Sequence, residues 1–266
     1  MTVPHPHRPS ARAVASFQGW RAFRHRNYRL FFVGQLVSMI GTWMTSVAQS
    51  WLILQLTGNP FDLGLVTVFQ FGPVLVLGLF GGVIADSLPK RRTLYVTQTV
   101  AMGVSFALFA LAATHTVQVW HVFLLAAVMG VRNAVDMPTR QAFAVEMVGR
   151  EDVGNAVALN SAMFNGARVL GPAIAGLVIA AFGVALAFFI DGVSFLAVLF
   201  GLFLMREVDL QLRPRIVRPT SARAVLTDLA EGLRYVRHTG IVLLSVTLVG
   251  LVATFGINFT ILIPTL

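Results

Sequence analysis

The sequence predicts an all-α membrane protein with seven transmembrane helices. Of its 266 residues, 56% are hydrophobic and only 12% are charged, whereas soluble domains carry roughly 25% charged residues. Apolar windows of about 20 residues recur along the chain, and each is long enough for a helix to cross roughly 30 Å of hydrocarbon. The seven windows are 30–56, 63–85, 93–113, 119–137, 156–181, 184–205 and 241–263.

The distribution of positive charge predicts the orientation of these helices. Lysine and arginine together number 20, and the cytoplasmic flanks of membrane helices collect such residues. The basic residues lie mainly in the N-terminal tail and at 90–92, 132–150 and 206–239, and the connections between them, 57–62, 114–118 and 182–185, contain none. We therefore expect a multi-pass protein of the cell membrane (inner or plasma membrane) with its N-terminus in the cytoplasm.

Composition and motifs exclude several classes of function. The net charge of +9 is divided among membrane flanks, which favours contact with membrane lipids and no nucleic-acid partner. The one lysine, Lys90, follows a proline, so the chain lacks an ATP-binding phosphate loop. The stretch GVSF, at 103–106 and 192–195, faintly resembles a motif of intramembrane serine hydrolases, which need a histidine within hydrogen-bond reach of the serine. The nearby histidines, His115 and His121, lie at the outer membrane edge. We expect no enzyme, no catalytic residues, no metal and no cofactor.

Polar stretches divide the chain into four parts. Residues 1–28 form a cytoplasmic tail, 29–205 a six-helix transmembrane bundle, 206–239 a cytoplasmic linker, and 240–266 the first helix of a truncated second bundle. The second half of the linker has a candidate N-cap followed by apolar residues at helical spacing, namely Ser221, Val225, Leu229, Leu233 and Val236. This pattern predicts an amphipathic helix lying on the membrane surface.

The entrances to the first and seventh spans match each other. RAFRH stands at 21–25 before the first span, and RYVRH stands at 234–238 before the seventh. Either this short match is chance, or the seventh span begins a second copy of the six-helix unit, as in the duplicated bundles of secondary transporters.

The first span carries polar residues along one face. They step by three and four residues, which is the spacing of one helix face, and are Gln35, Ser38, Thr42, Thr45 and Gln49. Polar side chains in lipid must face a partner or a water-filled cavity. A stripe through the full depth favours a wet path, and helix-helix hydrogen bonding is the alternative.

Charged residues inside the later spans need partners. Arg168 lies near the middle of the fifth span on the same face as Asn165, and Asp191 is the acidic residue well inside the sixth. We expect Arg168 and Asp191 to pair, or Arg168 to bind an anionic group of a substrate. In the fourth span, Asp136 follows Arg132 by four residues, which predicts an ion pair at a helix end kinked by Pro138.

One loop resembles a signature of the major facilitator superfamily. GGVIADSLPKRR, at 81–92, is similar to that superfamily's loop between helices two and three, G-x-x-x-D-R-x-G-R-R. The matching residues, with Lys90 alongside, are Gly82, Asp86, Arg91 and Arg92, while Ser87 and Pro89 depart from the pattern. The resemblance implies a gating loop, in which the aspartate meets the N-terminus of the eleventh helix.

A second stretch resembles the antiporter motif of the fifth helix in the same superfamily. ARVLGPAIAG, at 167–176, matches at Gly171, Pro172 and Gly176. With IGTWM at 40–44 and QLTGNP at 55–60, it makes the chain most similar to the drug and siderophore exporter branch, which includes the enterobactin exporter and the transmembrane secretion effector type. This implies a major facilitator-type six-helix N-terminal bundle plus the first helix of a second, incomplete bundle.

The resemblance implies a proton-coupled exporter that works by alternating access on amphiphilic, drug-like or siderophore-like small molecules. The polar stripe of the first span and Asn258 are then candidates for the substrate path, with Asn165 and Arg168 beside them, and Asp191 is a candidate for proton coupling. The superfamily has twelve helices, of which seven are in this sequence, so a C-terminal half is an expected partner. The alternative is a non-transporting membrane fragment or assembly partner.

Overall fold

A computed structural model describes residues 18–210, 234 and 237–251, and the remainder of the chain lies outside it. The described residues are almost entirely helical and contain no strand, so the prediction of an all-α protein is confirmed. The elements are η2 (Gln18–Arg24), α1 (Arg26–Thr57), α2 (Pro60–Ser87), α3 (Lys90–Ala113), α4 (Val119–Phe182), α5 (Val184–Leu204), η3 (Glu207–Asp209) and α7 (Gly240–Leu251).

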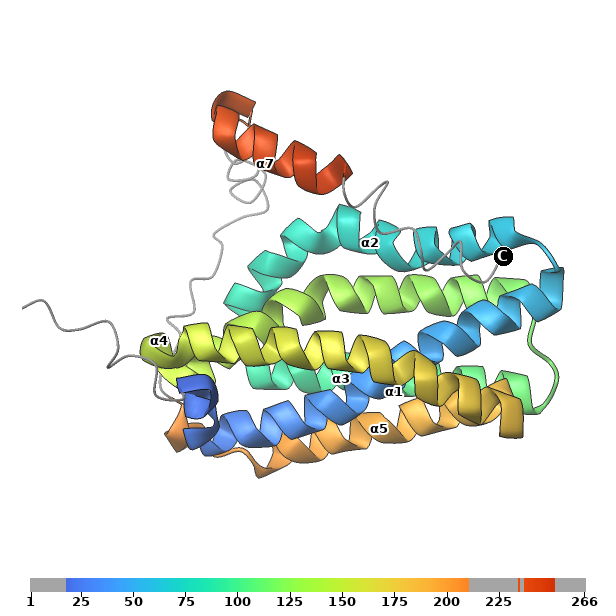
Figure 1. Ribbon diagram of the computed structural model, residues 1–266, viewed down its shortest axis with the longest axis horizontal. Helices are drawn as coiled ribbons and strands as arrows, with labels where there is room; N and C mark the ends of the chain where they lie inside the picture. The colour runs from blue at the N-terminus through green and yellow to red at the C-terminus, as the bar shows by residue number, and fades with distance from the viewer. Residues whose placement is uncertain (1–17, 211–233, 235–236, 252–266) are drawn as a thin grey trace, which may run out of the picture.

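Five of these helices, α1 to α5, are long and apolar enough to cross a membrane. The longest, α4, has 64 residues and would extend about 96 Å if it were straight, roughly three times the thickness of the hydrocarbon core. It is broken at Gly149, where φ is 73° and ψ is 175°, because glycine adopts a positive φ without a steric penalty. Figure 1 shows the two arms, green and then yellow, returning side by side.

The two arms of α4 correspond to the fourth and fifth predicted spans, but the helices are longer than the apolar windows. The windows leave residues 138–155 as a connection, whereas the structure is helical there on both sides of Gly149. The helix also continues through Pro138 as far as Gly149, so the helix end expected near Pro138 is wrong. Hydropathy detects the part of a helix in hydrocarbon, and a helix continues beyond that part as long as its backbone hydrogen bonds are satisfied.

Small residues allow α1 to approach α5 closely. A Cβ at Gly34 would lie 2.8 Å from the carbonyl oxygen of Ala197, and one at Gly201 would lie 2.9 Å from that of Leu30. Helices in lipid associate through such close packing, because the lipid offers no hydrophobic drive for their assembly. The other extensive contacts join α1 to α4, α2 to α4, and α3 to both α4 and α5.

Two apolar clusters lie at different depths of the bundle. One contains Met44, Ile53, Val122 and Phe188, and the other contains Tyr28, Phe31, Phe143, Met147 and Leu202. The helices α1, α3, α4 and α5 contribute residues to both clusters. On each of these helices, polar side chains lie between the residues of one cluster and those of the other. The buried members of this layer are Gln35, Ser38, Thr97, Gln98, Arg132, Asp136, Thr139, Asp191 and Ser194. The core is therefore apolar at both ends and polar in the middle.

The end of the predicted tail is attached to the bundle. Ala22 is fully buried, and its backbone N–H donates to Oδ1 of Asn155 at 2.8 Å. Arg21 and His25 both contact the carboxylate of Asp152, at 3.2 and 3.0 Å. These two basic residues before the first span thus have a protein partner on α4. The division of the chain into four domains stays a prediction, and the predicted amphipathic helix of the linker falls outside the described residues apart from a few at its end.

Candidate functional site

Asp136 is the centre of the polar layer. It is fully buried and accepts hydrogen bonds from Oγ1 of Thr97 at 2.7 Å and Nε2 of Gln98 at 2.8 Å, both on α3. Its carboxylate forms ion pairs with Nη2 of Arg132, at 3.1 Å, and with Nη2 of Arg140. All three charged residues come from the first arm of α4, at successive steps of four residues, which places them on one face.

The predicted ion pair between Arg132 and Asp136 is confirmed, but its setting differs from the expected helix end. Arg132 is nearly buried and also donates from Nε to the backbone oxygen of Thr97 at 3.1 Å. Two guanidinium groups share one carboxylate, so the cluster carries a net positive charge inside the bundle. Arg140 was not singled out from the sequence, although its spacing of four residues from Asp136 is the signal that could have found it. Thr97 and Gln98 could not be found in that way, because they belong to another helix.

Arg140 extends the network to α1. Its Nη1 donates to Oε1 of Gln35 at 3.1 Å, and Gln35 is almost completely buried. The Nε2 group of Gln35 is buried without a hydrogen-bond partner among the described residues. The N-terminal end of the predicted polar stripe therefore joins the charged cluster of α4.

Asp191 forms a second buried node. It is 1% exposed, and its Oδ2 accepts from Oγ1 of Thr45 at 3.0 Å and from Oγ of Ser105 at 2.7 Å. The hydroxyl of Ser194 donates to the backbone oxygen of Asp191 itself. Within the described part of the chain, no basic nitrogen lies within 4.0 Å of this carboxylate. Hydroxyl groups from α1 and α3, rather than a cation, hold the carboxyl group of α5.

The expected ion pair between Arg168 and Asp191 is wrong. Arg168 is exposed, and its Cζ lies 5.8 Å from the ring centroid of Trp43, which is a cation-π geometry. The second arm of α4 packs against α1 around Trp43, whereas α5 packs against α1 around Gly41, where a Cβ would lie 2.7 Å from Oδ1 of Asp191. Similar depth in the membrane did not bring the two groups together, because they contact α1 at different positions around its axis.

The other members of the predicted stripe lie inside the bundle. Ser38 is 3% exposed and Gln49 is 7% exposed. Thr42 donates to the backbone oxygen of Ser38, one turn earlier in the same helix. The hydrogen bond from Thr45 to Asp191 joins α1 to α5, in agreement with the alternative of helix-helix hydrogen bonding. Their role in a substrate path stays a prediction.

Asn165 lies at a cavity between the two arms of α4. The cavity has a volume of about 680 Å³ and is lined in part by Gln141, Asn160, Ser161, Phe164 and Asn165. Neutral amides and hydroxyls thus gather around an otherwise apolar wall. Asn165 donates from Nδ2 to the backbone oxygen of Ser161 at 2.9 Å. Asn258, the remaining candidate for the path, lies outside the described residues.

Comparison with known proteins identifies the family. The family model described as transmembrane secretion effector, a family of the major facilitator superfamily, matches residues 17–264. The chain belongs to this family.

Several transporters of the superfamily are related to the chain. The multidrug efflux pump Tap of Mycolicibacterium fortuitum is 30% identical over 230 residues, which are 85% of this chain and 55% of the relative. The staphyloferrin A transporter of Staphylococcus aureus (strain NCTC 8325 / PS 47) is 29% identical over 173 residues, 64% of this chain and 44% of the relative.

A third relative is the uncharacterized MFS-type transporter YfiS of Bacillus subtilis (strain 168). It is 26% identical over 211 residues, 79% of this chain and 49% of the relative. The chain spans about half the length of the curated relatives it matches. No solved structure gave a significant match.

The major facilitator loop signature has partners within this bundle. Nζ of Lys90 pairs with Oε1 of Glu146 at 2.7 Å, and both side chains are less than one-tenth exposed. Arg91 donates to the backbone oxygens of Leu202 and Phe203, at 2.9 and 3.2 Å, in the last turn of α5. The two basic residues thus hold α3 against α4 and α5. Basic groups at the C-terminal end of a helix are favourable partners for its free carbonyl groups.

The remaining residues of the signature lie elsewhere. Arg92 is exposed. A Cβ at Gly82 would meet no other atom within 4 Å, so the structure gives this glycine no close contact inside the bundle. Asp86 belongs to the last turn of α2, and its side chain lies outside what the structure describes.

The antiporter-like motif of the superfamily has one close contact in the bundle. A Cβ at Gly171 would clash with the side chain of Trp43 and lie 3.0 Å from the backbone oxygen of Ile40, so this glycine sets the approach of α4 to α1. Pro172 lies within the helix, and Gly176 is exposed with no atom near its Cβ position. In the described residues, no three histidine, aspartate or glutamate side chains gather as metal ligands do.

Proposed function

We propose that the chain is the N-terminal part of a proton-coupled exporter of amphiphilic small molecules that works by alternating access in the cell membrane. The observation that carries the proposal is the family membership. The buried polar layer supports it, since charged groups inside a membrane bundle mark ion or substrate pathways more often than they stabilise the fold. In this proposal the N-terminus and the basic end of α3 face the cytoplasm.

The substrate class follows from two lines of support. Two relatives are named as a staphyloferrin A transporter and a multidrug efflux pump. The cavity beside Asn165 combines apolar walls with neutral amides and hydroxyls, which suits a bulky amphiphile. Gln35, Asn165 and Arg168 are the residues we assign to the path.

Asp191 is the residue we assign to proton coupling. A carboxyl group that accepts only hydroxyl hydrogen bonds can gain a proton without breaking an ion pair. Asp136 differs, because protonation there would leave Arg132 and Arg140 without their shared counterion. The two buried acids therefore have different roles: Asp191 exchanges the proton, and Asp136 holds the cationic cluster.

Dye efflux driven by a proton gradient tests the proposal. The chain is placed in proteoliposomes alone or together with the C-terminal half of the multidrug efflux pump Tap, and extrusion of a fluorescent cationic dye is followed. We expect efflux when both halves are present, loss of the dependence on the gradient with Asp191→Asn, and no such loss with Asp62→Asn at the start of α2. Gradient-dependent efflux that survives Asp191→Asn would remove that residue from the coupling.

The alternative function is that of a non-transporting membrane fragment or assembly partner. Efflux from the chain alone would exclude this alternative. Absence of efflux with every C-terminal half, together with stable co-purification of the halves, would support it.

A further inference from the structure

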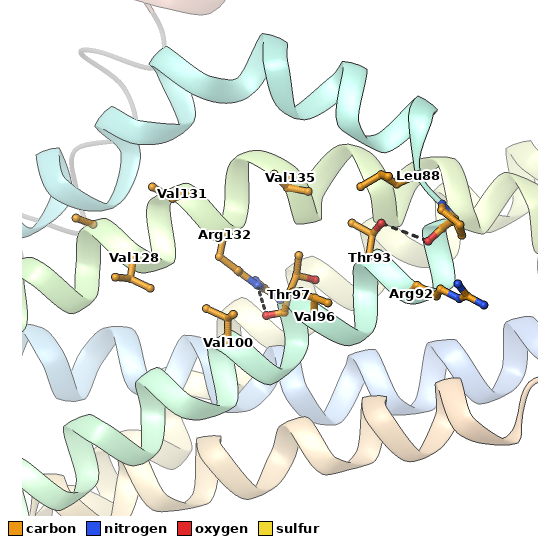
Figure 2. Close-up of a pocket in the computed structure, with 12 residues that line it drawn as sticks. Leu88, Arg92, Thr93, Val96, Thr97, Val100, Val128, Val131, Arg132 and Val135 are labelled. Atoms are coloured by element: carbon orange, nitrogen blue, oxygen red, sulfur yellow. Dashed lines mark hydrogen bonds between the residues drawn. The ribbon is translucent and has the colours of Figure 1, made fainter. Parts of the chain in front are cut away.

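An apolar groove runs along the bundle between α3 and the first arm of α4, next to the loop that precedes α3. Its volume is about 770 Å³. The walls are formed mainly by valines, Val96 and Val100 on α3 and Val128, Val131 and Val135 on α4 (Figure 2). Val96 is 64% exposed and Val131 is 47% exposed, so the groove opens away from the core, toward the surroundings of the bundle.

The groove has one cationic group that is free to bind a ligand. Lys90 pairs with Glu146, and Arg91 is held by α5 and Glu207. Arg132 reaches the floor of the groove, but it is used by Asp136 and the backbone of Thr97. Arg92 lies at the end of the groove where α3 begins, is exposed, and has no partner among the residues that the structure describes.

The position of Arg92 calls for an anion from outside the protein. It stands in the first turn of α3, which contains no acidic residue. The N-terminus of a helix carries a partial positive charge, so cations are unfavourable there and anions are favourable. Lys90 and Arg91 stand in the same turn and have acceptors within the bundle, which leaves Arg92 as the charge of this turn without a counterion among the described side chains.

The dimensions match one leaflet of a membrane. Val100 follows Arg92 by eight positions, a distance of about 12 Å along a helix, and one leaflet of the hydrocarbon core is about 15 Å deep. The groove is therefore cationic at the headgroup level and apolar along the depth of an acyl chain. Basic pockets between membrane helices are known to select acidic headgroups.

We propose that this groove is a binding site for one anionic phospholipid. Its phosphate-bearing headgroup contacts Arg92 at the start of α3, and one acyl chain lies along the valines of α3 and α4. The site shares no lining residue with the cavity beside Asn165, which lies between the two arms of α4. The proposal goes beyond the proposed function and does not depend on transport.

Native mass spectrometry of the full chain tests this site. The protein in a neutral detergent is titrated with palmitoyl-oleoyl phosphatidylglycerol or with the corresponding phosphatidylcholine, and the affinity of the first bound lipid is measured. We expect phosphatidylglycerol to bind about fivefold more tightly, as one basic residue near a membrane surface confers. Arg92→Gln should abolish this preference. Arg150→Gln, an exposed arginine at the same end of the bundle but outside the groove, should retain it.

A test variant and a matched control variant probe the apolar part of the site. Val131→Trp fills the groove and should weaken the first binding event of both lipids at least fivefold, whereas Val169→Trp, at a valine that is 71% exposed on the second arm of α4, should not. Equal affinity of the wild-type chain for the two lipids overturns the proposal, as does a preference that Arg92→Gln retains. If the wild-type chain forms dimers, and Val131→Trp alone converts them to monomers while lipid binding is unchanged, a second copy of the chain covers the groove instead of a lipid.

Discussion

Replacement of Asp136 by asparagine tests whether the polar layer is held together by one carboxylate. The substitution would keep the shape of the side chain but remove the charge that two guanidinium groups share. Arg132, with a side chain only 7% exposed, would then be a buried cation without a counterion. Removal of one partner from a buried pair costs about 3–5 kcal/mol, so we expect Asp136→Asn to lower the free energy of unfolding by about that amount.

Unfolding in mixed micelles with increasing sodium dodecyl sulfate, followed by circular dichroism and by the fluorescence of the four tryptophans, gives this free energy. Glu151→Gln serves as the control, because Glu151 is exposed and surface substitutions change stability by less than about 0.5 kcal/mol. Arg132→Met added to Asp136→Asn should recover part of the loss, since the orphaned cation is removed. If Asp136→Asn destabilises the protein no more than Glu151→Gln, the carboxylate does not organise the layer.

Two further predictions concern contacts between the helices. Gly41→Ala should destabilise the bundle by about 1–3 kcal/mol, because its Cβ would lie 2.6 Å from Oγ of Ser194. Gly103→Ala, with no atom near its Cβ position, should instead stabilise the bundle by about 0.5–1 kcal/mol. Equal effects of the two substitutions in the same unfolding assay would contradict this packing. Lys90→Met should expose the loop to trypsin by leaving Glu146 buried and unpaired, and Lys90→Met with Glu146→Gln should restore much of the resistance. Proteolysis rates that do not differ between the single and double variants would show that the pair does not hold α3 against α4.

Two apolar windows and one residue pair show which features of the structure could be predicted from the sequence. The window 184–205 nearly coincides with α5, because every residue there is solvated by lipid or by other helices and hydropathy reports this directly. The window 119–137 underestimates the first arm of α4, which continues to Gly149, because the last turns of this arm carry Arg140 and Glu146, which lower the local hydropathy. The pair Arg132 and Asp136 could be predicted for a local reason, since a spacing of four residues brings side chains together within one helix.

The sequence by itself determined the helical class, the bundle spans, the alternation of charge between connections and the family resemblance. These features depend on how each segment is solvated and on contacts within one turn of helix, both of which are set by neighbouring residues. The tertiary structure decided which buried groups meet: Thr97 and Gln98 with Asp136, Thr45 and Ser105 with Asp191, and Trp43 rather than Asp191 with Arg168. Such contacts depend on how each helix is rotated about its axis and which neighbour it packs against, and no pattern along a single helix contains that information.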